Sequence, residues 1–256
     1  MRILLKLQPL QNTPLSVPRE YIRNFIYSTI KDTEYGWMHD ARYKHFCFSN
    51  FFPFTKDNTL HKGNIYKLLL SSPFEKLVKN VYQKAALDGE FRFGKLRFNL
   101  VSFHYIQTPL RVEHIITATP IIIRLPKHLF EKYFIDSPKE YEFWTDEMFL
   151  NAFMEPLIKN GVRRFNHYLQ SIRSEENEMD ESSLPLDLIK TIKYKKCVLG
   201  WDKHFRGTLW EFIINEKWQR SEFIKYLFEA GFGERNASSG SGFVNFPSIK
   251  RKSTEI

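Results

Sequence analysis

The sequence has few of the features that mark secreted or membrane proteins. Its 256 residues include only two cysteines, Cys47 and Cys197, far apart in the chain. They form neither a disulfide framework nor a thiolate metal knuckle, so we expect both thiols to be reduced, buried and inert. No apolar run approaches the roughly 20 residues that span a bilayer, and the first residues become polar too soon for a secretory signal. We therefore expect a soluble, cytoplasmic protein without a membrane partner.

The chain also has fewer acidic than basic residues. The chain has 38 Lys and Arg against 29 Asp and Glu, a formal net charge of +9. A positive surface favours a polyanion or an anionic membrane and does not distinguish them. The eight histidines have no partners at metal-ligand spacing, and no Gly-Lys-Ser or Gly-Lys-Thr marks a nucleotide-binding loop. We expect neither a metal nor a cofactor.

The order of predicted elements occurs twice along the chain. The first set is a strand at 2–10, a helix at 17–32, extended segments at 44–54 and 64–72, a helix at 73–87, and a strand at 91–108 bent near Gly94. The second set is a long strand at 111–125 interrupted by Pro120, a helix at about 146–174, a hairpin at 191–215, a helix at 216–233 and a strand at 242–246. Both have the βαββαβ order of a ferredoxin-like module. We predict an α+β protein with tandem ferredoxin-like (RRM-like) domains at 1–110 and 111–256.

Four of the eleven glycines fall in the stretch GFGERNASSGSGFVN, which begins at Gly231. A flexible linker is not expected between a strong helix and an apolar strand. The missing Cβ atoms would let backbone N–H groups approach phosphates or bases closely. A plain turn, with Gly231 as a helix C-cap, is the alternative.

A helix that ends in Gly-x-Gly, followed by ERNASS and GSGFV, resembles the glycine-rich loop of the RAMP superfamily. Within it, the chain is most similar to the endoribonucleases that process CRISPR repeat RNA. Their tandem ferredoxin-like fold agrees with the doubled element order. Members of this family use the loop either to bind repeat RNA or in packing that shapes the RNA groove. The resemblance implies that the following loop residues lie near the RNA: Gly231, Gly233, Arg235, Gly240 and Gly242.

The stretch GWMHDARYKHFCFSNF carries the candidate chemistry. The nucleases that it resembles have a histidine in this loop before a short apolar-Ser strand, which FCFSN matches, so the likeness implies that His39 is catalytic. Some relatives have a Lys six residues later, where this chain has His45, with Lys44 one residue earlier. Other relatives use a tyrosine on the first helix, for which Tyr27 is the nearest candidate and Tyr43 another.

The resemblance implies a metal-independent endoribonuclease that cuts CRISPR repeats in a precursor transcript to give guide RNAs. The 2′-OH would attack, leaving a 2′,3′-cyclic phosphate and a 5′-hydroxyl. A histidine can transfer the protons near neutral pH, while Lys44 or protonated His45 stabilises the phosphate charge and a tyrosine orients the hydroxyl. The alternatives are a non-catalytic RAMP subunit that binds guide RNA in a surveillance complex, and an RNA-binding protein unrelated to CRISPR. Association with an effector complex and formation of a homodimer stay open.

Basic residues suggest where RNA would bind. Lys203, His204 and Arg206 lie at a predicted hairpin tip that could follow a phosphate backbone, although a solvated turn is an equal alternative. We expect a basic cleft between the domains rather than an open sheet of aromatics. Its predicted members are Arg163, Arg164, Lys193, Lys195 and Lys196.

Overall fold

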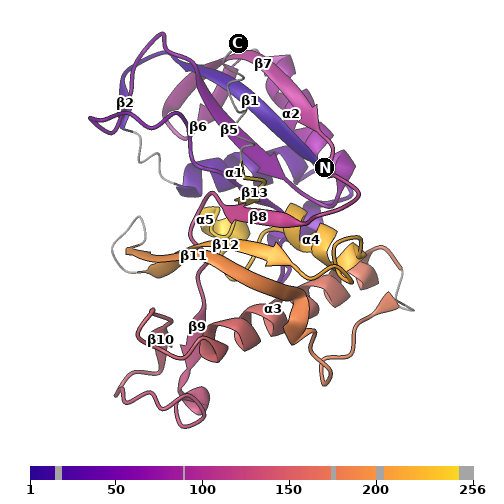
Figure 1. The fold of residues 1–256 in the computed structure, drawn as a ribbon. Helices are drawn as coiled ribbons and strands as arrows, with labels where there is room; N and C mark the ends of the chain where they lie inside the picture. Colours follow the sequence, from indigo (N-terminus) through magenta and orange to yellow (C-terminus); the bar gives the residue numbers. More distant parts are fainter. Residues whose placement is uncertain (15–18, 89, 174–176, 200–204, 248–256) are drawn as a thin grey trace, which may run out of the picture.

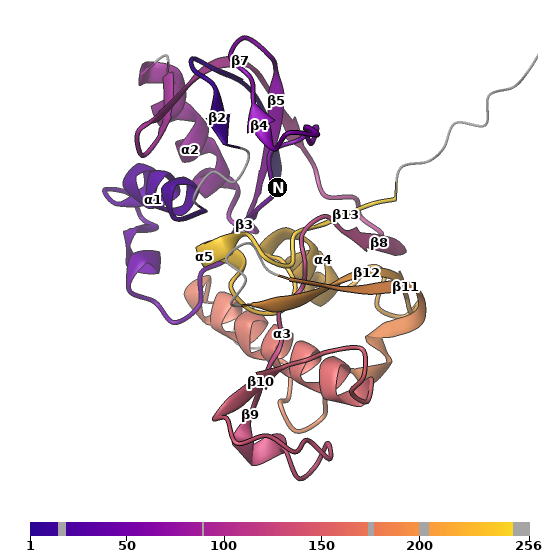
Figure 2. The same cartoon turned by 90° about the vertical axis from the view of Figure 1, so that its left-hand side faces the viewer.

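The computed structural model describes residues 1–14, 19–88, 90–173, 177–199 and 205–247. Two antiparallel sheets form the centres of two halves that lie one above the other (Figure 1). The N-terminal half runs from indigo to magenta, and the sheet of the C-terminal half is mostly orange and yellow. The glycine-rich stretch lies where the two halves meet (Figure 2).

The N-terminal sheet has the strand order β3-β5-β1-β7-β6. Its elements are β1 (Arg2–Pro9), α1 (Arg19–Ile30), η1 (Gly36–His39), β3 (Cys47–Phe48), β5 (Tyr66–Ser71), α2 (Glu75–Asp88), β6 (Glu90–Phe93) and β7 (Leu96–Ile106), and β2 (Thr13–Pro14) pairs separately with β4 (Thr59–Leu60). Ile3, Leu5 and Leu7 alternate along β1 and share a core cluster with Ile22 and Ile26 of α1. Alternation on the strand and helical spacing on α1 therefore put both apolar faces into one core.

The C-terminal sheet has the strand order β11-β12-β8-β13. Its half contains β8 (His114–Thr117), β9 (Arg124–Pro126), η2 (Lys127–Leu129), β10 (Tyr141–Phe143), α3 (Asn151–Ser171), η4 (Leu186–Leu188), β11 (Ile189–Leu199), β12 (Arg206–Ile214), α4 (Glu222–Ala230), α5 (Asn236–Ser239) and β13 (Val244–Asn245). Trp144, Phe153 and Trp210 are fully buried and pack with their ring centroids 4.3 to 5.5 Å apart. This aromatic cluster joins α3 to the sheet.

The structure confirms the α+β class. Each half has four main strands, which can be counted from first to last along the chain. In both sheets the second, third, first and fourth strands then lie side by side, as β3-β5-β1-β7 and as β11-β12-β8-β13. This is the order expected for two βαββαβ modules. The division of the chain into domains at residues 110 and 111 stays a prediction. The predicted bend near Gly94 is a full turn, at a φ of 61°, which separates β6 from β7 as a hairpin.

The predicted strand at 111–125 is interrupted at Pro120 as expected, but the prediction that both of its parts belong to one strand is wrong. Only β8 joins the sheet, and β9 pairs instead with β10 in a separate two-stranded hairpin. Pro120 explains the break, because it has no N–H for a strand ladder. Beyond it, an isolated bridge between Ile121 and Thr208 connects the chain to β12. The hairpin is thereby free to extend away from the sheet, and it lies at the far end of the molecule in Figure 1.

Buried polar contacts join the two halves. Arg2 is 3% exposed, and its Nη1 donates to Asn245 Oδ1 at 2.8 Å while its guanidinium lies 3.7 Å from the Phe228 ring. Burial lowers the pKa of Arg2 to about 10.

None of the helices in the described parts of the chain combines the length and the hydropathy that a bilayer-spanning helix needs.

Candidate active site and RNA interface

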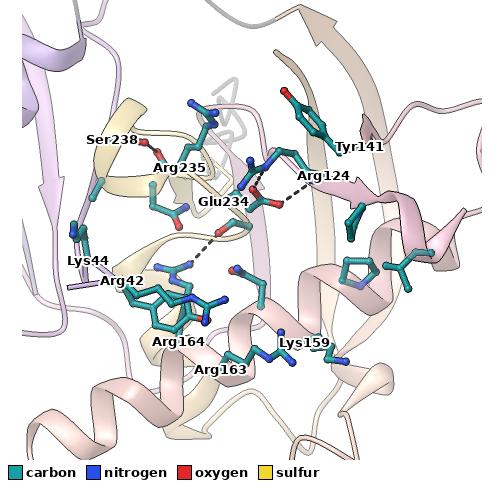
Figure 3. Close-up of a pocket in the computed structure, with 18 of the residues that line it drawn as sticks. Arg42, Lys44, Arg124, Tyr141, Lys159, Arg163, Arg164, Glu234, Arg235 and Ser238 are labelled. Carbon is teal, nitrogen blue, oxygen red and sulfur yellow. Dashed lines mark hydrogen bonds and ion pairs between the residues drawn. The ribbon is translucent and has the colours of Figure 1, made fainter. Parts of the chain in front are cut away.

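A groove of about 1020 Å³ runs between the two halves, and both contribute to its walls. Positive charge dominates it: eight Lys and Arg side chains line it with three Glu. The basic residues are Arg23, Arg42, Lys44, Arg124, Lys159, Arg163, Arg164 and Arg235. Figure 3 shows Arg42 and Lys44 on one side of the groove and Arg124 and Tyr141 on the other. Such a groove can hold a polyanion that spans the two halves.

His39 and Tyr27 meet at the N-terminal side of this groove. His39 ends η1 and its side chain is 68% exposed. Its Nδ1 lies 2.8 Å from Asp40 Oδ1, and its ring packs edge-on against Tyr27 with centroids 5.1 Å apart. Burial raises the pKa of Tyr27, so its hydroxyl stays protonated at neutral pH. The structure therefore brings together two of the residues predicted to be catalytic.

Lys44 lies in the same groove and closes the loop that carries His39. Its Nζ donates to the carbonyl of His39 at 3.0 Å and also to the carbonyl of Ala41. Burial lowers its pKa. Lys44 thus supplies positive charge beside His39 and holds the loop in shape at the same time.

His45, in contrast, does not reach the groove. It is 0% exposed, with Nδ1 2.8 Å from the Tyr226 hydroxyl and Nε2 3.0 Å from Nδ1 of His167. Trp37 and Phe74 pack near its ring. This position between the two halves favours a structural role over the catalytic role predicted from its spacing.

The stability of the protein should depend on the charge of His45. Burial, with Arg164 and then His167, lowers its pKa well below the ordinary value. The unfolded chain takes up this proton near pH 6.5 and the folded chain does not. The unfolding free energy should therefore fall as the pH drops below about 6.5, by up to about 1.4 kcal/mol per pH unit. Urea unfolding between about pH 7.5 and 5.5 measures this slope.

A variant pair assigns the slope to this residue. His45→Gln cannot titrate and should flatten the slope. His128→Gln, at an exposed position, should leave it unchanged. Equal slopes in His45→Gln and the parent would contradict a neutral, buried His45.

The glycines of the predicted RNA loop are buried and pack against the protein itself. A Cβ on Gly242 would lie 1.8 Å from the carbonyl oxygen of Phe232, and one on Gly240 would lie 2.4 Å from that of Phe48. On Gly233 it would meet the carbonyl oxygen of Ile122 at 2.8 Å. All three residues have positive φ, as does Gly231 at the C-cap of α4. Close packing within the chain thus accounts for these glycines without contact to a ligand.

Arg164 of α3 holds the first part of this loop. It is 3% exposed, and its Nη2 donates to the carbonyl of Ala230 while Nη1 donates to those of Gly231 and Gly233, at 2.8 to 3.2 Å. These carbonyls lie at the C-terminal end of α4, where a cation is favourable. Arg164 was predicted to bind RNA in the cleft, and the structure engages it in the loop instead.

Among the predicted loop residues, Gly233 and Arg235 line the groove, and Arg235 brings a positive charge to it. Arg235 has a φ of 60°, and its guanidinium carbon lies 3.8 Å from the centre of the Phe205 ring. At the neighbouring hairpin, Arg206 is exposed at the start of β12 but is not one of the described residues that line the groove. Lys203 and His204 lie outside the described residues.

The other predicted cleft residues divide between the groove and the sheet. Arg163 lines the groove, and its Nε lies 2.8 Å from Glu181 Oε2. Lys193, Lys195 and Lys196 are exposed on β11, and the described lining of the groove does not include them.

Several groove residues were not predicted from the sequence. Arg23 precedes Tyr27 by one helical turn, and Arg42 lies in the His39 loop, so each could have been found from its spacing to a candidate. Arg124 and Tyr141 gave no such signal. They reach the groove because β9 leaves the sheet to pair with β10.

The architecture is that of an α+β protein with two main antiparallel sheets and a basic groove between them, and comparisons with known proteins show its family. Residues 106–246 match the family model described as CRISPR associated protein Cas6, C-terminal. The chain belongs to the Cas6 family. It is 28% identical over 255 residues to CRISPR-associated endoribonuclease Cas6 2 of Methanocaldococcus jannaschii, covering 96% of this chain and 99% of that relative.

Solved structures share the fold. A Cas6-related protein from Pyrococcus furiosus superposes with a TM-score of 0.67 at 18% identity, covering 98% of this chain and 99% of the other. A RAMP protein described as binding different RNA substrates gives a TM-score of 0.65 at 16% identity, covering 96% of this chain and 99% of the other. These structures show the shared fold, while the family model and the curated relative confirm the resemblance to proteins that process CRISPR repeat RNA.

Proposed function

We propose that this protein is an endoribonuclease that cuts CRISPR repeat RNA within a precursor transcript to release guide RNAs. The observation that carries the proposal is the exposed His39 beside Tyr27 in a basic groove, in a chain of the Cas6 family. The curated relative from Methanocaldococcus jannaschii is named an endoribonuclease. Positive charge on both sides of the groove suits a phosphate backbone.

In this proposal RNA supplies its own nucleophile. The 2′-OH of the nucleotide before the cut attacks the adjacent phosphorus, the bond to the 5′-oxygen breaks, and the products are a 2′,3′-cyclic phosphate and a 5′-hydroxyl. Because Asp40 engages Nδ1 of His39, Nε2 is the nitrogen that exchanges a proton with the RNA. The protonated hydroxyl of Tyr27 can donate to a phosphate oxygen or orient the 2′-OH, and the Lys44 ammonium stabilises the phosphate charge.

Cleavage in EDTA tests this function directly. Pure protein is incubated with end-labelled repeat RNA transcribed from the CRISPR arrays of the same genome. We expect scission at one position within the repeat, with EDTA leaving the rate unchanged because only protein side chains transfer protons in this mechanism. The upstream product should resist labelling at its 3′ end until its 2′,3′-cyclic phosphate is removed.

The outcomes separate this function from its rivals. RNA that is bound but never cut would indicate a non-catalytic RAMP subunit. RNA that is cut equally well when unrelated to a CRISPR repeat would argue against repeat processing. A 3′-hydroxyl on the upstream product would contradict attack by the 2′-OH.

A further inference from the structure

Three aromatic rings form a row on the C-terminal side of the groove. Tyr141 and Phe143 of β10 have centroids 5.5 Å apart, and Phe143 lies 5.6 Å from Phe205, just before β12. An arginine lies over each end of the row: Arg124 is 5.7 Å from the Tyr141 ring and Arg235 is 3.8 Å from the Phe205 ring. We call these five residues the aromatic strip.

The strip is fixed to the glycine-rich loop by one carboxylate. Glu234 Oε1 accepts from the backbone N of Arg124 at 3.0 Å, and Oε2 accepts from Arg124 Nε. The backbone N of Glu234 in turn donates to the carbonyl of Ile122 at 3.0 Å. These contacts set the β9–β10 hairpin against the loop that carries Arg235, so both arginines of the strip are held in place.

Part of the strip is accessible from the groove. Tyr141 is 42% exposed, and the Arg124 side chain is 43% exposed. Tyr141, Arg124 and Arg235 all line the groove. The fully buried rings of this half, such as Trp210, belong to the core instead.

We propose that the aromatic strip is a binding site for single-stranded RNA, where a base stacks on Tyr141 while Arg124 and Arg235 contact the adjacent phosphates. Unpaired bases stack on tyrosine and on arginine planes with little dependence on sequence. Duplex RNA keeps its bases stacked on one another and cannot use such a surface.

The place of the strip defines which part of the substrate it binds. This step rests on the proposed function. Arg42, from the His39 loop, lies across the groove from Tyr141 in Figure 3, and Arg163 and Lys159 of α3 lie along the lower edge of the same view. RNA with its scissile phosphate at His39 must therefore cross the groove, which these basic residues line, before a base can reach Tyr141. The strip therefore binds an unpaired segment of the RNA that lies to one side of the cut, across the groove from His39.

Fluorescent base analogues test the strip independently of cleavage. The probe is repeat RNA with 2-aminopurine at one unpaired position at a time and 2′-fluoro groups in place of the 2′-hydroxyls, which removes the nucleophile. With the parent protein we expect at least one position to be quenched by stacking. Tyr141→Ala should abolish that quenching and weaken binding by about 5- to 150-fold, whereas Tyr141→Phe, which keeps the ring, should preserve both.

Tyr105→Ala is the matched control, because Tyr105 is 38% exposed on β7 and is not among the described residues of the groove. It should bind as the parent does. Normal binding and quenching by Tyr141→Ala, in a protein that cuts unmodified repeat RNA, would overturn the strip and leave the proposed function intact. Failure of the parent to bind any repeat RNA would overturn both.

Discussion

Replacing His39 with alanine should reduce the single-turnover cleavage rate of repeat RNA by about 10²- to 10⁴-fold, the usual contribution of a general acid or base. Binding should weaken by less than about tenfold, because one neutral hydrogen-bonding side chain contributes about 0.5 to 1.5 kcal/mol. The phosphates are held instead by basic residues spread over both sides of the groove. Rates at saturating protein and equilibrium affinities, measured on the same RNA, separate the two effects.

His128 provides the control within the same groove. It lies on η2, is exposed and lines the groove from the C-terminal half. His128→Ala should cleave at nearly the parent rate. That result would show that the loss of any one imidazole from the groove does not by itself reduce cleavage. Cleavage by His39→Ala at the parent rate would place the proton transfer elsewhere, and Tyr27 would be the next residue to replace.

The order of elements could be predicted because the two apolar periodicities differ along this chain. Alternation of apolar residues predicted β1, and helical spacing predicted the helix at 17–32, which the structure shows as α1 beginning at Arg19. The hairpin of β11 and β12 followed from two β-branched and aromatic runs. The interruption of the strand at Pro120 could be predicted from the proline itself. The new pairing of the segment beyond it, with β10, could not, because its apolar residues continue into the core as a strand of the same sheet would.

Some features of the candidate site could likewise be predicted from the sequence, and others could not. The loop that carries His39 could be identified by resemblance, and its neighbours on α1 follow from helical spacing. The burial of His45 could not be predicted, since it depends on Tyr226 and His167 from the other half of the chain. The same holds for Arg164, whose partners are carbonyls more than sixty residues away. Contacts between residues far apart in the sequence were therefore the missing information in each case.

The glycine-rich loop leads to the second large effect, which concerns stability. Gly242→Ala should destabilise the protein strongly, because the new Cβ would lie 1.8 Å from the carbonyl oxygen of Phe232 at a φ of 69°. The same pair is joined by a hydrogen bond from the backbone N of Phe232 to the carbonyl of Gly242, at 2.9 Å, so the two segments cannot separate without losing it. A left-handed alanine costs about 1 to 2 kcal/mol, and overpacking adds about 1 to 3 kcal/mol.

Gly63→Ala separates these two contributions. Gly63 has a φ of 83°, but a Cβ there would meet nothing within 4 Å. Its variant should therefore lose only the about 1 to 2 kcal/mol of backbone strain. Urea unfolding of both variants and the parent gives the difference, which we expect to be about 1 to 3 kcal/mol larger for Gly242→Ala. Equal losses would mean that the loop yields to the added methyl group. Internal packing would then not explain Gly242, and direct contact of its backbone with RNA would become the better account of this glycine.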